Sequence, residues 1–249
     1  MTNNNMIFIA NWKMNGEKSH ISGINKTIKF LKQSKNKKNQ IIYCPPFTLI
    51  SSVKNKVKNT KIKVGAQNLS QLNDYGAFTG SVNSKLIKSA GGDYVIVGHS
   101  EIRNQENDIL INKKIHSALK EKLKVILCIG ETYKEKKNNK TLSVLKRQIT
   151  IALKNIKKIN NIIFAYEPRW AIGTGKIPKS SELKKNFKEI NNIIKKLKKN
   201  QKYKIIYGGS VNSKNVSELK EINDLKGFLI GSASLRAKNF IDIIKKSTN

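Results

Sequence analysis

The sequence predicts a single (β/α)8 barrel over residues 1–249. Short apolar runs alternate with longer segments of helical period, a pattern that indicates parallel strands joined by right-handed crossovers. No linker divides the chain, and one such barrel commonly needs about 250 residues. Candidate functional motifs follow the apolar runs, where barrel active sites assemble. An open doubly wound sheet is the alternative, but no Gly-x-Gly-x-x-Gly motif follows the first predicted strand.

Eight apolar runs are predicted to be strands, because doubly buried parallel strands read as continuous apolar stretches. The runs are Ile7–Ala10, Ile41–Cys44, Ile62–Ala66, Tyr94–Gly98, Val125–Gly130, Ile162–Glu167, Lys204–Gly208 and Phe228–Ile230. Apolar residues at three- and four-residue steps predict helices between and after them. These are Glu17–Gln33, Thr48–Val57, Ser84–Ala90, Asp108–Lys122, Lys140–Ile159, Glu182–Lys199, Asn215–Lys220 and Lys238–Lys246.

The chain is strongly basic, with 49 Lys and Arg against 16 Asp and Glu and a net charge of +33. Such a balance is the first criterion for a nucleic-acid-binding protein. The lysines, however, occur along the whole chain without interleaved aromatic residues, so we interpret them as solvated surface and predict no specific nucleic-acid partner. A basic nucleic-acid-binding or inactive structural barrel stays the alternative; filter binding that falls steeply with salt would support it.

Other classes of protein fit the composition poorly. No apolar run approaches the roughly 18 residues of a membrane span, and the polar start before Met6 is no signal peptide, so we expect a soluble, cytoplasmic protein without a membrane partner.

Cys44 and Cys128 lie far apart in apolar runs and are predicted to be reduced core thiols. His20 and His116 lie in lysine-rich segments and are expected at the surface. No Cys/His cluster has zinc spacing, and no metal is predicted.

The segment from Ala165 to Lys176 carries the strongest functional signal. Glu167 ends a buried strand directly before Pro168, which stops strand pairing. The glycines at 173 and 175 then allow close backbone approach to a ligand and leave N–H groups free for an anion. A carboxylate base followed by a lid that binds phosphate is therefore predicted.

Together with this segment, four further blocks resemble the triosephosphate isomerase family over essentially the whole chain. They are residues 11–16 (Asn-Trp-Lys-Met-Asn-Gly), 98–101 (Gly-His-Ser-Glu), 207–211 (Tyr-Gly-Gly-Ser-Val) and 227–234 (Gly-Phe-Leu-Ile-Gly-Ser-Ala-Ser). The resemblance implies a TIM barrel that interconverts dihydroxyacetone phosphate and D-glyceraldehyde 3-phosphate, in glycolysis and gluconeogenesis, without cofactor or metal. Another sugar-phosphate isomerase or epimerase would keep the phosphate loops but not the complete catalytic set.

The resemblance also implies a role for each site residue. Glu167 would be the base, and His99 would be the electrophile, with a neutral ring as in the family. Lys13 and Asn11 would supply positive charge and a hydrogen bond to substrate oxygens. Backbone N–H groups of the loops after the last strands would bind the phosphate. The phosphate-binding residues are Gly173, Ser210, Gly231 and Ser232, and the supporting residues are Glu101, Ser100 and Thr79.

The long Gly65–Gly80 stretch predicts a homodimer, because its apolar side chains are poor candidates for a solvent-exposed rim. In the family that this chain resembles, the loop crosses to a second subunit. The resemblance then implies that Thr79 of one chain reaches toward Asn11 and Lys13 of the other, with Met14 lining the receiving pocket. The apolar side chains are Leu69, Leu72, Tyr75 and Phe78.

Four features depart from the family pattern. Arg169 replaces a small apolar residue at the lid hinge, which puts the lid kinetics in question. Ile102 stands where an arginine is usual, and the Arg103–Asp108 segment is short, so nearby support and subunit contacts are expected to differ. Ser232 replaces a glycine, a change that retains the backbone donor.

Overall fold

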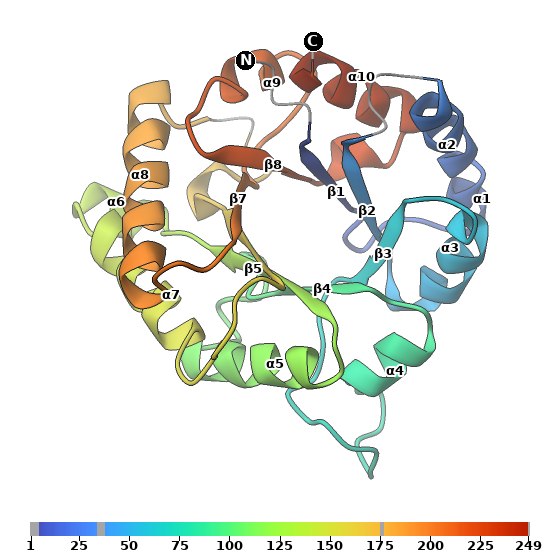
Figure 1. Cartoon of the computed structure of the whole chain (residues 1–249), viewed down its shortest axis with the longest axis horizontal. Coiled ribbons are helices and arrows are strands. Elements are labelled where there is room, and N and C mark those ends of the chain that lie inside the picture. The colour runs from blue at the N-terminus through green and yellow to red at the C-terminus, as the bar shows by residue number, and fades with distance from the viewer. Residues whose placement is uncertain (1–4, 34–37, 175–176, 249) are drawn as a thin grey trace.

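In the computed structural model, which describes residues 5–33, 38–174 and 177–248, eight parallel strands close into one barrel in sequence order. Helices surround the barrel (Figure 1), so the predicted fold class is confirmed. The strands are β1 (Ile7–Asn11), β2 (Gln40–Cys44), β3 (Lys63–Ala66), β4 (Tyr94–Val97), β5 (Lys124–Ile129), β6 (Ile162–Tyr166), β7 (Lys204–Tyr207) and β8 (Leu225–Ile230).

The helices lie outside the strands, as their amphipathic periods predict. They are α1 (Lys18–Ile21), α2 (Ile24–Lys32), α3 (Ile50–Val57), α4 (Ser84–Ser89), α5 (Asp108–Lys120), α6 (Tyr133–Lys137), α7 (Thr141–Ala152), α8 (Ser180–Leu197), α9 (Val216–Leu219) and α10 (Ala237–Thr248), with 3-10 turns η2 (Phe47–Leu49), η3 (Arg169–Ala171) and η4 (Ser232–Ser234).

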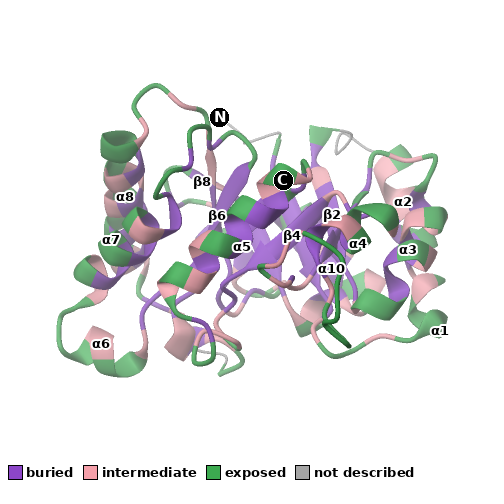
Figure 2. Ribbon diagram, turned by 90° about the horizontal axis from the view of Figure 1, so that it is seen from below, coloured by how far each residue is buried: buried purple, intermediate pink, exposed green. Residues whose placement is uncertain are grey.

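The strands are buried on both faces (Figure 2), which explains their continuous apolar sequences. One cluster fills the barrel interior and includes Ile9, Ile96 and Ile126. A larger cluster lies between strands and helices, where Phe187 and Phe240 pack. This double burial fixes the strand ends, and with them the loops that carry the functional side chains.

Two predicted helices have different boundaries in the structure. The segment predicted as one helix from Glu17 breaks into α1 and α2 at Gly23, a residue of low helix propensity. The helix predicted to reach Ile159 ends at Ala152, because Asn155 has a left-handed φ of 60° that a continuing helix does not allow.

One short helix and the first residues of one strand were not predicted from the sequence. The short helix α6 begins with a capping box in which Thr132 accepts from the Glu135 backbone and Glu135 accepts from Thr132. Strand β8 begins three residues before the predicted Phe228, because the apolar criterion excluded Lys226 and Gly227.

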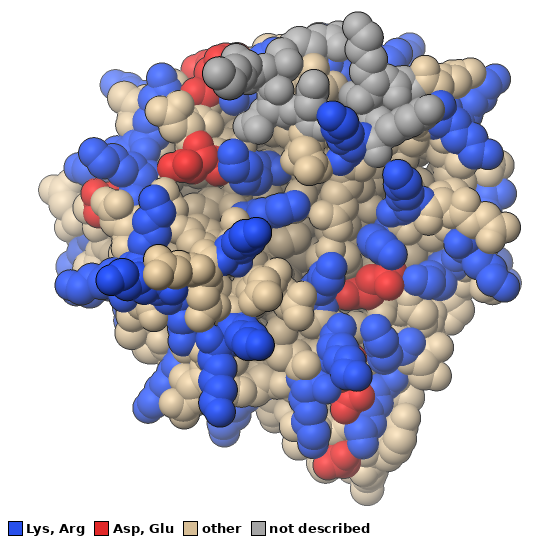
Figure 3. Space-filling model, in the orientation of Figure 1, with Lys and Arg blue, Asp and Glu red and all other residues tan. Residues whose placement is uncertain are grey.

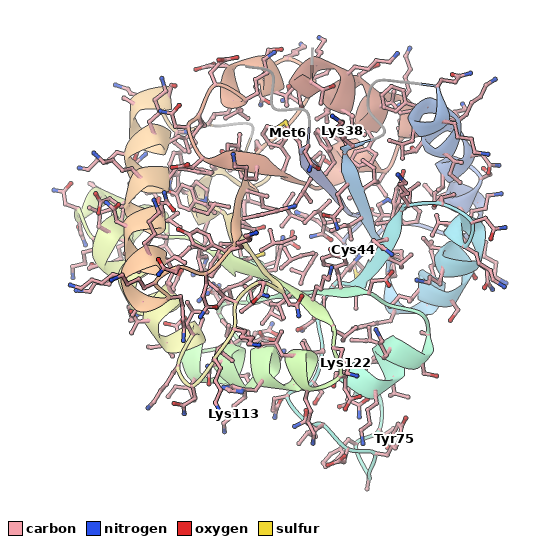
Figure 4. All side chains as sticks on the ribbon, in the orientation of Figure 1. Met6, Lys38, Cys44, Tyr75, Lys113 and Lys122 are labelled. Carbon is pink, nitrogen blue, oxygen red and sulfur yellow. The ribbon has the colours of Figure 1, made fainter. Side chains whose placement is uncertain are left out.

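Several smaller predictions are confirmed. Cys44 and Cys128 are buried free thiols, with Cys44 inside the barrel (Figure 4). His20 and His116 are exposed. Across the described ranges, no helix is both long and apolar enough to cross a membrane.

Candidate active site

The predicted site residues meet at the end of the barrel where the strands finish. They line one pocket of about 270 Å³, although they come from five separate segments of sequence. Convergence of strand ends is what parallel topology dictates for side chains that follow buried strands. The predicted residues in this pocket are Asn11, Lys13, His99, Glu167, Gly173, Ser210, Gly231 and Ser232.

Glu167 follows β6 and is only 1% exposed. Its Oε2 accepts a hydrogen bond from the Ser100 backbone N–H at 3.2 Å, whereas its Oε1 has no hydrogen-bond partner. An added Cβ at Gly208 would lie 2.8 Å from the Glu167 Cγ, so glycine at that position leaves room for the carboxylate. A buried carboxylate with one unpaired oxygen facing the pocket is suited to accept a proton from a bound molecule.

His99 follows β4 and is 6% exposed. Its Nδ1 accepts the Glu101 backbone N–H at 3.3 Å, an arrangement that assigns the proton of a neutral ring to Nε2. Nε2 lies 3.4 Å from the Glu167 Oε1 and 3.3 Å from the Asn11 Nδ2. Two N–H donors therefore converge beside the base, where a substrate oxygen could accept both.

Lys13 follows β1 in a strained conformation, with a φ of 55° that is uncommon for a residue with a side chain. Three contacts hold it: its N–H donates to the Asn11 Oδ1 at 3.0 Å, its carbonyl accepts from Gln67 at 2.8 Å, and its Nζ pairs with the Glu101 Oε1 at 2.7 Å. The ammonium therefore lies beside the Glu101 carboxylate, and the Lys13 side chain passes close to Gly231 on the pocket wall.

The phosphate-binding candidates surround the far side of the pocket. Ser232 opens η4 directly after Gly231, so both residues lie at the start of a helical turn. Ser210 donates its hydroxyl to the carbonyl of Ala171 at 2.7 Å, which ties the β7 loop to the β6 loop. Gly173 adopts a φ of 71° and is exposed, a conformation that favours glycine. Gly175 lies outside the described residues.

Thr79 lies apart from this pocket, on the loop between β3 and α4. That loop projects beyond the barrel (Figure 1), with Tyr75 at its tip (Figure 4). Phe78 and Tyr75 are 50% and 67% exposed in the single chain, whereas Leu69 is buried in its own chain and needs no second subunit to cover it. Met14 is 97% exposed beside the active site.

Sequence reasoning missed Glu131, which follows β5 and is fully buried. It accepts the Trp170 indole N–H at 2.8 Å and the Tyr166 hydroxyl at 3.1 Å. Burial raises the pKa of this carboxyl, and the hydrogen bond from Trp170 opposes that effect. Glu131 thus anchors the segment behind Glu167. Its position after a predicted strand was an available signal.

Arg169, the unusual hinge residue, also has a defined contact. Its guanidinium donates to the Asn104 Oδ1 at 2.6 Å, in the short segment after β4. Burial, followed by the nearby charge of Arg103, lowers the pKa of Arg169. Arg103 itself donates to Asp108 at 2.7 Å and to the carbonyl of Gly98 at 3.0 Å. The β4 and β6 loops are therefore tied together outside the pocket.

We expect Arg169→Val to raise turnover by about two- to fivefold, because hinge rotation must otherwise break a hydrogen bond to a charged, half-buried group. Asn104→Ala should have the same effect, and the double variant should gain no more than either single variant. Steady-state kinetics of the three variants measure this coupling. Additive effects would show that the two side chains act separately.

No cluster of three or more His, Cys, Asp or Glu side chains that could hold a metal ion occurs in the part of the chain that is described. The side chains that line the pocket supply one carboxylate, one imidazole, one ammonium, two amides and two hydroxyls, and its loops add backbone N–H donors.

Comparisons with known proteins identify the family of the chain. A triosephosphate isomerase family model matches residues 6–247. The triosephosphate isomerase of Thermodesulfovibrio yellowstonii is 40% identical, covering 95% of this chain and 97% of the relative, and that of Alkaliphilus metalliredigens is 38% identical, covering 96% and 98%. The crystal structure of triosephosphate isomerase from Bartonella henselae superposes with a TM-score of 0.89 at 31% identity, covering 98% of this chain and all of that one. The chain is thus an isomerase that belongs to the triosephosphate isomerase family.

Proposed function

We propose that this enzyme interconverts dihydroxyacetone phosphate and D-glyceraldehyde 3-phosphate by proton transfer through an enediolate, with Glu167 as the base. Its unpaired Oε1 would take the proton from the substrate carbon next to the carbonyl and return it to the neighbouring carbon. Substrate binding would replace the contact between Ser100 and Glu167, since catalytic hydrogen bonds in a free enzyme commonly rearrange on binding.

The remaining groups would stabilise the charge that develops on oxygen. The His99 Nε2–H and the Asn11 amide, which meet beside Glu167, would donate to the enediolate oxygens. The His99 ring would also pass the hydroxyl proton from one substrate oxygen to the other, which completes the exchange of hydroxyl and carbonyl. Lys13 would add a positive charge held in place by Glu101. Preorganised donors of this kind commonly give the largest share of barrier lowering.

Backbone N–H groups of Gly173, Ser210, Gly231 and Ser232 would hold the phosphate. These residues line the same pocket as the base and lie in the loops after β6, β7 and β8. The loops after the last two strands commonly form the phosphate site of such barrels. Binding there would place the three-carbon skeleton between the phosphate loops and the Glu167 carboxylate.

The observation that carries the proposal is the 3.4 Å approach of the Glu167 Oε1 to the His99 Nε2 within one buried pocket. A coupled assay of triose-phosphate interconversion in both directions tests it. We expect full activity after exhaustive chelation, because the carboxylate, imidazole and ammonium fill every role in the reaction. A requirement for added metal would refute this cofactor-free mechanism.

The proposal includes a homodimer formed through the Gly65–Gly80 loop. The loop is held in shape within its own chain: the Asn83 amide donates to the carbonyl of Asp74 at 3.1 Å, and the Phe78 ring packs on Gly76. An ordered loop that presents apolar side chains to solvent is suited to enter a second chain. Thr79 would then support Asn11 and Lys13 of the partner.

The proposal places the enzyme in the cytoplasm, with triose phosphates as its small-molecule partners and no specific nucleic acid. Lysines occur in nearly every helix of the described chain, and on the face that Figure 3 shows they are spread over most of the surface. Such a diffuse positive field favours attraction of anionic substrates, by about 10- to 1000-fold in association rate at low salt.

A further inference from the structure

The barrel end where the strands begin, opposite the active site, contains a second cavity of about 150 Å³. Its wall includes the first residues of several strands, namely Gln40 of β2, Tyr94 of β4, Lys124 of β5 and Lys204 of β7. Figure 3 looks onto this end and shows basic side chains around a central hollow, with few acidic ones between them. We call this cavity the basic mouth.

Strand pairing places Lys124 and Lys204 at the same end of the barrel, on two strands separated by β6. Lys124 pairs in register with Tyr94, and Lys204 pairs with Ile163, so neither backbone can move away from its neighbour. Lys202 is the third lysine that lines the cavity, and Lys226 of β8, outside the lining, lies close enough to Lys204 to act on its pKa. Burial, and after it the charges of Lys124 and Lys226, lower the pKa of the Lys204 ammonium. Lys204 is half-buried, unlike the exposed lysines on the helices, whereas Lys124 is exposed.

No carboxylate neutralises this group within the described part of the chain. Lys124, Lys204 and Lys226 form no ion pair there, and Lys124 lies 5.6 Å from the centre of the Tyr94 ring. The nearby Asp93 is already paired with Lys54 at 2.9 Å. The remaining residues, 1–4, 34–37, 175–176 and 249, include no Asp or Glu in the sequence. The three lysines that line the cavity, Lys124, Lys202 and Lys204, thus have no ion-pair partner among the described residues. Asp224 nevertheless lies nearby, since burial, and after it the charge of Asp224, raises the pKa of the lining residue Tyr203.

We propose that the basic mouth binds a free phosphate-type oxyanion, inorganic phosphate or pyrophosphate, at a site separate from the active site. The cavity volume admits one such ion, since a water molecule occupies about 30 Å³ of liquid. Lysine ammonium groups recognise phosphate as point charges, and the lining side chains of Gln40 and Asn161 add neutral hydrogen-bonding groups. Strands of this length hold the two sites roughly 13–20 Å apart, at about 3.3 Å per residue.

Calorimetric titration of the intact enzyme with inorganic phosphate and with pyrophosphate tests the proposal, with sodium chloride at matched ionic strength as the reference. Wild type should bind two phosphates per chain, one in the active site and one in the basic mouth. Lys204→Met should weaken the second binding step by about five- to tenfold, the effect of removing one close charge at intermediate dielectric. Lys113→Met, which removes an exposed charge from α5, is the matched control and should change neither step.

Competitive inhibition of the isomerase by phosphate reports the active site alone, and its inhibition constant should be equal in wild type and Lys204→Met. Without phosphate and at low salt, Lys204→Met should unfold at a higher temperature than wild type, because a repulsive charge is removed. If the methionine variant folds poorly, Lys204→Gln should show the same weaker second binding step and the same higher unfolding temperature. One phosphate per chain in wild type, or an unchanged second step in both Lys204 variants, would overturn the proposal. If phosphate failed to inhibit the isomerase while the second binding step stayed as predicted, the result would count against the phosphate-binding residues assigned in the active site and not against the basic mouth.

Discussion

Glu167→Asp is expected to lower turnover by about 100-fold, the effect of displacing a reacting group by roughly 1 Å. The shorter side chain withdraws the carboxylate from the pocket, and Gly208 beside it offers no side chain to fill the space. Affinity for glycerol 3-phosphate, which carries the phosphate but cannot isomerise, should change little because the backbone donors stay in place. Steady-state kinetics and a binding titration measure the two quantities.

Glu221→Asp is a suitable control, since it makes the same change at an exposed position. Its turnover should equal that of wild type. If Glu167→Asp kept wild-type turnover, or lost phosphate affinity in proportion to turnover, Glu167 would not be the base that acts only in the chemical step.

Phe78→Glu is expected to convert the enzyme to monomers and to lower turnover by at least about tenfold. Phe78 is half exposed in the single chain, and an apolar loop buried over several hundred Å² contributes several kcal/mol at roughly 25 cal/mol per Å². Two chains that each carry a net charge of +33 repel each other, and this repulsion opposes dimer formation. Physiological salt, however, screens the repulsion beyond about 8 Å. Sedimentation at physiological salt and micromolar protein should therefore show a wild-type dimer that weakens only at low salt.

Leu197→Glu introduces the same kind of charge at an exposed apolar residue on α8 and should leave the dimer intact. Because Thr79 would support Lys13 across the interface, the Phe78→Glu monomer should lose activity as well as assembly. A wild-type monomer with full activity would contradict both the dimer and that support.

The sequence alone was sufficient for the fold class and the pocket. Each strand is buried on both faces, so its apolar run stands out, and parallel pairing then places Asn11, His99 and Glu167 at one end of the barrel. Local motifs also located the Gly/Ser loops after β7 and β8 that line the pocket. These features depend on short-range patterns combined with one topological rule.

Features that depend on tertiary packing were not predictable in the same way. Glu131 carries no distinctive motif, and its role arises from Trp170 and Tyr166, which fold back onto it. The contact between Arg169 and Asn104 joins two loops 65 residues apart in sequence. The early end of α7 depends on one left-handed residue, Asn155, inside a segment whose apolar period continues.

Isomerisation in deuterium oxide tests the central claim most directly. A proton held on Glu167 in the enediolate complex would exchange with solvent, so dihydroxyacetone phosphate made from unlabelled D-glyceraldehyde 3-phosphate should carry deuterium at carbon 1. Glu167→Gln should abolish both isomerisation and label uptake while retaining affinity for glycerol 3-phosphate. Unlabelled product from wild type, or undiminished label uptake in Glu167→Gln, would contradict proton transfer by this carboxylate.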